Sequence, residues 1–242
     1  RRSGAKAVIA LPRITKERER KVIENLIRAV NDLQPDGFLV SHLGSLQMIR
    51  TLSDLPIYAN YPFHFFNTFT LKPLREQKIT GLTLSPELKK GEVFALFDHP
   101  DFEPVELEIL VFGALELMVS QFCPIGAWVG KKPPRSCGHP CRQGRYFLRD
   151  RKEIDFPVII DEFCRMHLLN SRYLSLLREL ENLKNKRLSL RLELRHQTPE
   201  VAAKVINLFL TGLERDATEE DQAKLESFLD QGLTRGHFYR GV

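Results

Sequence analysis

The feature that most constrains the fold is an alternation of short apolar segments with helical segments. Apolar segments of strand length lie at 6–11, 37–44, 56–61, 79–84 and 105–113, and segments with helical spacing separate them. The alternation resumes with predicted strands at 156–161 and 187–194 and predicted helices at 171–183, 199–213 and 219–231. Such a pattern predicts a mostly parallel sheet with right-handed crossovers, which is a barrel or a doubly wound sheet.

The number of predicted strands favours an incomplete barrel. Six or seven strands are one or two fewer than a closed eight-stranded (β/α) barrel needs, and an absent N-terminal part would supply the others. We therefore predict an α/β fold, a single TIM-barrel-like (β/α) domain over 1–242 that lacks its N-terminal strands. An irregular cysteine-rich loop module is expected within it at 115–167, because this stretch loses the periodicity after Gly113.

Two helices have particularly clear signals. The helix predicted at 15–33 carries an apolar stripe made of Val22, Ile23, Leu26, Ile27 and Val30. Ser85 followed by Pro86 and Glu87 predicts that a helix begins there, because serine favours the N-cap position and proline the first helical position.

Composition excludes some classes of protein. There is no apolar run close to the ~20 residues of a membrane span and no secretory leader, so we expect a cytoplasmic protein with no membrane association. The formal net charge of +5 fits attraction to RNA or to a small anionic substrate.

The four cysteines are clustered in the sequence, with the spacing Cys123-x13-Cys137-x3-Cys141-x22-Cys164. In a reducing compartment such a group favours metal ligands over disulfides, although four small buried side chains are also an acceptable interpretation. Four thiolates suit zinc or an iron–sulfur cluster. Only Cys137-x3-Cys141 resembles a zinc hook, so the long gaps favour a cluster.

A basic stretch overlaps the cysteines. It includes Lys131, Lys132, Arg135, Arg142 and Arg145, which we predict to bind nucleic acid or an anion, although a solvated loop surface is an equally ordinary interpretation. Tyr146 and Phe147 could stack on a base there or pack inward.

Polar residues near strand ends form the second group of candidates, because barrel active sites lie at the carboxyl ends of the strands. They are Arg13, His42, Asn60, Glu87, Glu116, Asp161, Arg165, His167, Glu193 and Arg195. Among them we predict catalytic roles for Asp161, Arg165, His167, Glu193 and Arg195, with Glu193 paired to an arginine because buried strand charge is costly alone.

Several segments together resemble the collagenase-like peptidase family, peptidase family U32. They are ELEILVFGALELMVSQFCPIGA, CGHPCRQGRYFLRDR, FPVIIDEFCRMHLLNS, LRLELR and TRGHFYRG. The resemblance implies a TIM-barrel-like fold and the C-terminal segment of a long member, with an upstream part of the same polypeptide or a partner subunit beside it.

The resemblance also implies an activity and a cofactor. The family is labelled as peptidases, yet its better-understood relatives are oxygen-independent hydroxylases of RNA or ubiquinone precursors. These relatives hold a four-iron four-sulfur cluster through four cysteines and use prephenate as the oxygen source. By similarity Cys123, Cys137, Cys141 and Cys164 would be the ligands. One departure is that many relatives have G-A-L-C where this chain has Gly113-Ala114-Leu115-Glu116.

Three functions therefore remain open. The first is an iron–sulfur-dependent hydroxylase acting on RNA or a similar substrate. The second is a peptidase, which is a hydrolase, although no G-x-S-x-G or H-E-x-x-H motif is present. The third is a non-catalytic domain in which zinc or a cluster braces a surface for RNA or a protein partner.

Overall fold

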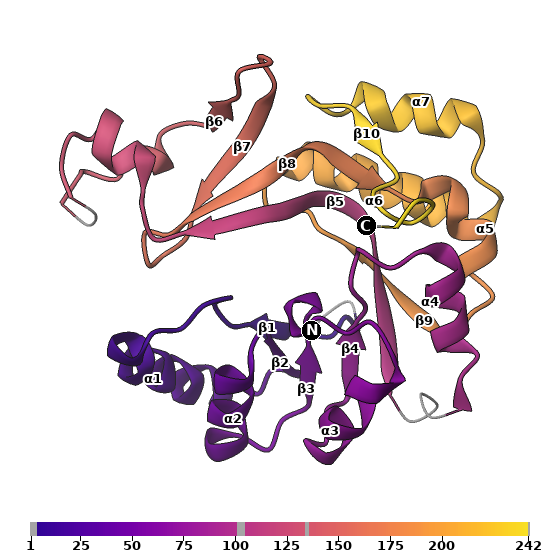
Figure 1. Ribbon diagram of the computed structural model, residues 1–242, viewed down its shortest axis with the longest axis horizontal. Helices are drawn as coiled ribbons and strands as arrows, with labels where there is room; N and C mark the ends of the chain where they lie inside the picture. The colour runs from indigo at the N-terminus through magenta and orange to yellow at the C-terminus, as the bar shows by residue number, and fades with distance from the viewer. Residues whose placement is uncertain (1–3, 101–104, 134–135, 242) are drawn as a thin grey trace. The chain divides into compact units, whose positions relative to one another are not determined.

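The computed structural model describes residues 4–100, 105–133 and 136–241. Within it the chain divides into two compact units, whose elements are labelled in Figure 1. The first unit comprises Arg1–Leu110, Asn185–Arg191 and Gly236–Val242, and the second comprises Val111–Lys184 and Leu192–Arg235. The description of 1–242 as one partial barrel domain stays a prediction.

The first unit contains a parallel sheet whose strands are separated by helices. Its strands follow the order β1-β2-β3-β4-β5, each parallel to the next, and β9 also pairs with β5. The strands are β1 (Val8–Ala10), β2 (Gly37–Val40), β3 (Ile57–Ala59), β4 (Gly81–Thr83), the beginning of β5 (Glu106–Ser120) and most of β9 (Leu188–Leu192). The helices are α1 (Arg20–Asn31), α2 (Leu43–Leu52), α3 (Leu71–Glu76) and α4 (Lys90–Phe97), with 3-10 turns at Glu17–Glu19, Tyr61–Phe63 and Thr68–Thr70. This part is the predicted α/β alternation.

Two details of the first unit differ from the sequence predictions. Only Ile23 and Ile27 of the predicted α1 stripe are buried, whereas Val22 and Leu26 are exposed, so the helix buries a narrow face. Helix α4 begins at Lys90 rather than at Ser85, because the Glu92 carboxylate accepts the Lys89 backbone N–H at 2.8 Å and caps the helix there. Ser85 instead closes a separate turn.

The second unit is an antiparallel sheet covered by helices. Strand β5 continues through it to Ser120 and pairs with β8 (Met166–Ser175), which pairs with β7 (Asp155–Ile160), which pairs with β6 (Tyr146–Arg149). Strand β10 (Leu233–Thr234) adds to β8 in parallel. The helices are α5 (Leu180–Leu183), α6 (Pro199–Glu214) and α7 (Glu219–Ser227), with short turns of helix at Ile125–Val129, Pro140–Arg142 and Leu177–Glu179.

The prediction of a mostly parallel sheet is therefore wrong for this half of the chain. The strand predicted to end at Gly113 runs seven residues further, and the segment 171–175, predicted as helix, is the end of β8. Consecutive strands with short connections pair antiparallel, whereas parallel pairing needs a long crossover. The structure is mixed α/β and compatible with an incomplete barrel, whereas the TIM-barrel assignment stays a prediction.

Aromatic packing fixes the core of the second unit. Phe112 and Tyr173, which are fully buried, stack with ring centroids 5.8 Å apart, and Phe209 of α6 meets Phe112 edge-on at 5.8 Å. These contacts join β5, β8 and α6, and each large ring removes a large apolar area from water. No helix in the described part of the chain is long and apolar enough to cross a membrane.

Candidate functional site

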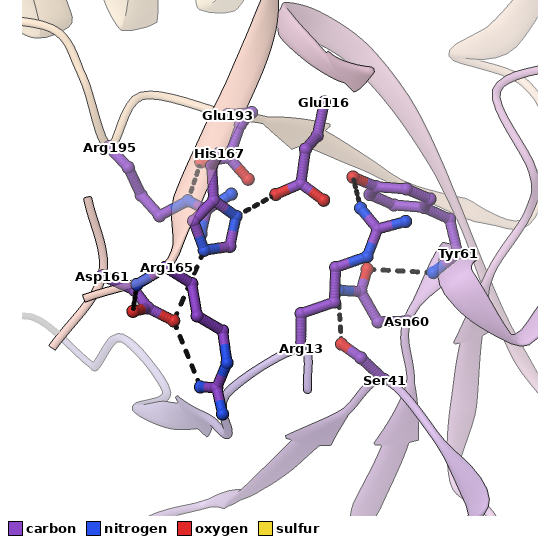
Figure 2. A network of polar contacts seen from close by, with 10 residues as sticks. All are labelled: Arg13, Ser41, Asn60, Tyr61, Glu116, Asp161, Arg165, His167, Glu193 and Arg195. Atoms are coloured by element: carbon purple, nitrogen blue, oxygen red, sulfur yellow. Dashed lines mark hydrogen bonds and ion pairs between the residues drawn. The ribbon is translucent and has the colours of Figure 1, made fainter. Parts of the chain in front are cut away.

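His167 is the centre of a polar cluster in the second unit. Its ring Nδ1 is paired with the Glu116 carboxylate, and its Nε2 lies 3.5 Å from Asp161 Oδ2 (Figure 2). All three side chains are largely buried. A histidine that contacts two carboxylates can pass a proton to either of them, which is what general acid–base catalysis requires.

Strand irregularity brings Glu116 to the ring. His167 lies near the start of β8, where it is opposite Val119 of β5 and Ile159 of β7. The pairing of β5 with β8 shifts register on both sides of Glu116. Such bulges re-aim individual side chains, and they are common beside active sites. Glu116 occupies the position at which the resemblance predicts a cysteine.

Asp161 organises the turn that joins β7 to β8. Its Oδ1 accepts the backbone N–H groups of Phe163 at 2.9 Å and Arg165 at 2.7 Å. Burial favours the neutral acid, but the hydrogen bond to His167, the Arg165 backbone N–H and the Arg165 charge outweigh it, so the pKa of Asp161 is lowered. The side chain therefore carries a negative charge at neutral pH.

Arg165 is the most unusual side chain in this turn, because it is only 2% exposed. Its guanidinium lies 3.5 Å from Asp161 Oδ2 and 4.9 Å from the centre of the Phe163 ring. A buried arginine costs free energy unless it is paired, and the Asp161 carboxylate supplies that partner here. The turn thus places a buried positive charge beside the Asp161 carboxylate.

Glu193 and Arg195 form the predicted ion pair at 2.6 Å, with Arg195 largely exposed. They follow strand β9 in the chain, and Glu193 packs directly on Gly113 of β5. A Cβ added to Gly113 would lie 2.5 Å from the Glu193 Cβ, so only glycine permits this approach. Both members of the pair belong to the second unit, as His167 does.

The four cysteines lie together in the second unit as free thiols, with Cys123 and Cys164 buried. Burial raises the pKa of the Cys141 thiol, and the charges of Cys123, Cys137 and Cys164 raise it further. Such charge effects weaken with distance, so they are consistent with four neighbouring thiols.

The backbone of Gly126 lies close to two of the cysteine sulfurs. The Gly126 N–H donates to Cys123 Sγ at 3.3 Å, and a Cβ at Gly126 would lie 3.4 Å from that sulfur and 3.6 Å from Cys137 Sγ. Gly138 and His139 both have positive φ, which folds the chain back between Cys137 and Cys141. Amide hydrogen bonds to sulfur and crowding of this kind are typical of cluster sites, in which they tune the thiolates.

The spacing of these thiols bears on which metal group they suit. Among the residues that the structure describes, no three His, Cys, Asp or Glu side chains are arranged to hold a single metal ion. Zinc needs its ligands around one point, whereas a four-iron cluster bonds each thiolate to a different iron and so separates the sulfurs. The chemistry of four thiols suits either group, and the preference for a cluster over zinc stays a prediction.

Most of the predicted anion-binding residues lie on the surface of the same segment. Lys131, Lys132, Arg142 and Arg145 are at least partly exposed, and Arg135 lies outside the described residues. Arg145 forms an ion pair with Asp230 at 2.6 Å and lies over the Phe147 ring. Their binding role stays a prediction.

The first unit has a polar network of its own at the carboxyl ends of its parallel strands. Arg191 of β9 contacts Glu108 at 2.6 Å and Asn60 at 2.8 Å, and Asn60 donates to Ser41 at 3.2 Å. Figure 2 also shows the contact between Arg13 and Tyr61, at 3.4 Å. Of the other strand-end candidates, His42 caps helix α2 and Glu87 is exposed.

Sequence reasoning named most members of the His167 cluster without its geometry. Asp161, Arg165 and His167 were predicted together, and the structure brings them together. The sequence marks Glu116 only as a strand-end residue, and its departure from G-A-L-C is the one signal that distinguishes it from other such residues. Sequence reasoning did not single out Arg191 and Glu108, because nothing in their segments distinguishes them from ordinary strand charges.

Comparisons with known proteins agree with the family resemblance. A family model described as "Peptidase family U32" matches residues 1–241. The tRNA hydroxylation protein P of Escherichia coli (strain K12) is 27% identical over 141 residues, which is 57% of this chain and 30% of that protein. Its namesake from Haemophilus influenzae is 28% identical over 120 residues, covering 48% of this chain and 25% of that protein.

A third relative matches along almost the whole chain. An uncharacterized protease of Methanocaldococcus jannaschii is 20% identical over 251 residues, which is 99% of this chain and 60% of that protein. The chain thus spans less than two thirds of the length of each of these relatives. No solved structure matches it. Because the family model covers nearly every residue, this chain belongs to peptidase family U32.

Proposed function

We propose that this chain carries the catalytic site of an iron–sulfur-dependent, oxygen-independent hydroxylase that modifies RNA. The observation that carries the proposal is the gathering of all four free cysteines around Gly126 and Cys141, beside the turn that leads to His167. Two relatives named as tRNA hydroxylation proteins make transfer RNA the first substrate to test.

Cys123, Cys137, Cys141 and Cys164 would hold a four-iron four-sulfur cluster. When bound, such a cluster supplies one-electron chemistry, and its potential depends on hydrogen bonds to the sulfurs and on solvent exposure. The Gly126 N–H and the burial of two of the cysteines act on those two properties.

The polar cluster would handle protons and negative charge. His167, in contact with Glu116 and Asp161, holds a proton near the start of β8 and can release it to a substrate atom. Arg165 supplies a fixed cation in a water-poor turn, and Glu193 with Arg195 supplies a second, more accessible charge pair.

Prephenate, the oxygen source that the family resemblance implies, suits cations of this kind. It carries carboxylates, which arginine binds through two parallel hydrogen bonds. We assign this contact to Arg195, because its exposed guanidinium can reach a ligand in solution.

Metal analysis of anaerobically purified protein tests the cofactor. We expect iron and acid-labile sulfide in equal amounts. The content of both per protein should be lower in the Cys141→Ser and Cys164→Ser variants. Ser136→Ala, an exposed neighbour of Cys137, is the matched control and should retain both. Stoichiometric zinc without sulfide, or full iron in every cysteine variant, would contradict the assignment.

Nucleoside mass spectrometry tests the reaction. Transfer RNA incubated with the reduced protein and prephenate should gain one oxygen atom at a nucleoside. His167→Asn and Glu116→Gln should lower this product by about 100-fold or more, the range typical of removing a general acid or base, with iron content unchanged. Equal product from these variants would remove the polar cluster from the mechanism.

Peptidase activity is the second candidate, because the relative that matches along almost the whole chain is named a protease. The contacts described for His167 are with carboxylates, which would activate water rather than a serine or cysteine. A protease assay on metal-free protein separates the two functions. Cleavage that disappears in both His167→Asn and Asp161→Asn would favour the peptidase.

A further inference from the structure

Two exposed aromatic side chains lie beside the first cysteine. Phe122 is 55% exposed and Trp128 is 71% exposed, and their rings meet edge-on with centroids 6.2 Å apart. We call them the aromatic pair. Large apolar side chains are normally buried, so an exposed tryptophan that contacts a second exposed ring suggests a surface with a binding role.

The backbone holds this pair in place. Trp128 is part of the short helix Ile125–Val129, in which the Ala127 N–H donates to the Cys123 carbonyl at 3.1 Å and the Gly130 N–H to the Ile125 carbonyl at 3.0 Å. The Lys132 N–H donates back to the Gly126 carbonyl at 3.3 Å, which returns the chain to the helix. Trp128 is therefore presented by an ordered turn that also carries the Cys123 thiol.

The charges around the aromatic pair in the sequence are all of one sign. From Leu117 to Arg149 the sequence has six Lys or Arg residues and no Asp or Glu. Lys131 and Lys132 are exposed and follow directly after the helix that carries Trp128, and Arg142 lies on the turn that packs against this helix. A partner for this surface must be negatively charged and must offer flat apolar faces.

We propose that the aromatic pair is a stacking platform for an unpaired RNA base, with Lys131 and Lys132 contacting the flanking phosphates. The inference rests on the proposed function and deepens it, because it states which part of an RNA the chain contacts first. Single-stranded nucleic acids combine base faces with backbone charge, and aromatic rings beside cations are how proteins usually bind them. A protein partner with an apolar surface fits less well, since it would have to cover the cations.

The composition of the chain provides a direct reporter. Trp128 is the only tryptophan among the 242 residues, so the tryptophan emission of the whole protein comes from the proposed platform. Titrating the purified full chain with a short RNA hairpin that has an unpaired loop should change this emission. A fully paired duplex of the same stem should change it much less, because its bases are already stacked.

Variants then separate stacking from charge. Trp128→Leu should weaken hairpin binding roughly 5- to 150-fold, as measured by fluorescence anisotropy of labelled RNA, because one stacked base is worth about 1–3 kcal/mol. Lys131→Ala with Lys132→Ala should lower the slope of affinity against salt by about 0.7 for each phosphate that is no longer neutralised. Phe69→Leu removes an aromatic ring that is 88% exposed in the first unit, and it should change neither quantity.

The outcomes distinguish this inference from the proposed function. Hairpin binding with unchanged Trp128 emission and unchanged affinity in Trp128→Leu would overturn the platform and leave the hydroxylase proposal standing. No binding of any RNA would overturn both. His167→Asn should lose the hydroxylated product but keep full hairpin affinity, because His167 belongs to the polar cluster and not to the platform.

Discussion

At the scale of single residues, Asp161 does two tasks with one side chain. One carboxylate oxygen closes the turn by accepting two backbone N–H groups, and the other contacts the buried Arg165 and His167. The shape of the turn and the charge balance of the site therefore depend on the same group.

The first prediction separates these two tasks. Asp161→Ala should lower the free energy of unfolding by about 2–4 kcal/mol, because it removes the acceptor of two N–H groups and a charge partner of a buried arginine. Asp161→Asn should cost less, since its amide oxygen still accepts the N–H groups. Urea denaturation measures both, and Glu162→Gln, at the exposed neighbouring position, should be neutral. Equal effects of Ala and Asn would show that the turn hydrogen bonds contribute little.

The second prediction concerns Gly113, whose φ is +139° and whose missing Cβ leaves room for Glu193. Gly113→Ala should destabilise the protein by about 1–3 kcal/mol, because the backbone adopts a conformation that side chains disfavour and because Glu193 must move. Gly91→Ala is the matched control, since nothing lies near its Cβ position in helix α4. It should leave stability unchanged or raise it by about 0.5–1 kcal/mol. Thermal unfolding of both variants tests the contrast.

At the scale of elements, helix α7 depends on a charged cap. Thr218 Oγ1 accepts the Asp221 N–H at 3.2 Å, the Asp221 carboxylate accepts the Thr218 N–H at 2.9 Å, and both carboxylate oxygens contact Arg215. The hydrogen bond from Arg215, followed by that from the Thr218 backbone, holds the pKa of Asp221 well below its usual range, although burial opposes this.

The third prediction follows from this lowered pKa. Folded Asp221 binds a proton more weakly than the unfolded chain does, so its stabilisation is complete above about pH 4 and decreases as the pH falls further. The stability difference between the wild type and Asp221→Asn should therefore be larger at pH 7 than at pH 3. Thr218→Ala should cost about 1 kcal/mol at pH 7 and less at pH 3, because the Thr218 hydroxyl also donates to the Asp221 carboxylate at 3.0 Å and helps to lower its pKa. Glu219→Gln, an exposed carboxylate in the same turn, should show a much smaller change with pH.

Elements whose signals are local could be predicted from the sequence. The strands and helices of the first unit follow short-range periodicity, and their order follows from it. The extension of β5 to Ser120 and the strand at 171–175 could not be predicted, because they are stabilised by pairing between segments some fifty residues apart. The contact of Glu116 with His167 could not be predicted either, because it joins residues 51 positions apart and depends on two register shifts.

The cysteines show the reverse case. Their number and isolation in the sequence make them candidates, and the structure holds all four as free thiols in the second unit. Their role as cluster ligands is still a prediction. The sequence could not predict that Gly126 lies against two of the sulfurs, because Cys137 is eleven positions further along the chain and no local pattern places it there.

At the scale of the whole molecule, the positive charge is concentrated in one segment. Outside Leu117–Arg149 the chain has 30 Lys or Arg against 31 Asp or Glu. The formal net charge of +5 therefore comes entirely from Leu117–Arg149, which has six Lys or Arg and no Asp or Glu. The protein as a whole should therefore attract polyanions through one surface rather than through its general charge.

The fourth prediction tests this distribution. Replacing Lys131 and Lys132 by glutamate, or Lys204 and Lys224 by glutamate, lowers the formal net charge by the same amount. Only the first pair should slow the association of RNA, by about tenfold or more at low salt, because it reverses the local field. Stopped-flow anisotropy measures the rates. Equal slowing by both pairs would mean that total charge, not its position, governs the encounter.

The chain passes between the two units four times, and this has a consequence for biosynthesis. The first unit also includes residues far along the chain, at Gly236–Val242. Among them Phe238 is buried, and its backbone carbonyl accepts the Lys90 N–H at 2.7 Å. A ribosome that has translated as far as Leu110 has therefore not yet made everything that this unit contains. The first unit must wait, partly assembled, until the last turn of the described chain emerges, and chaperones that act during translation would meet it in that state.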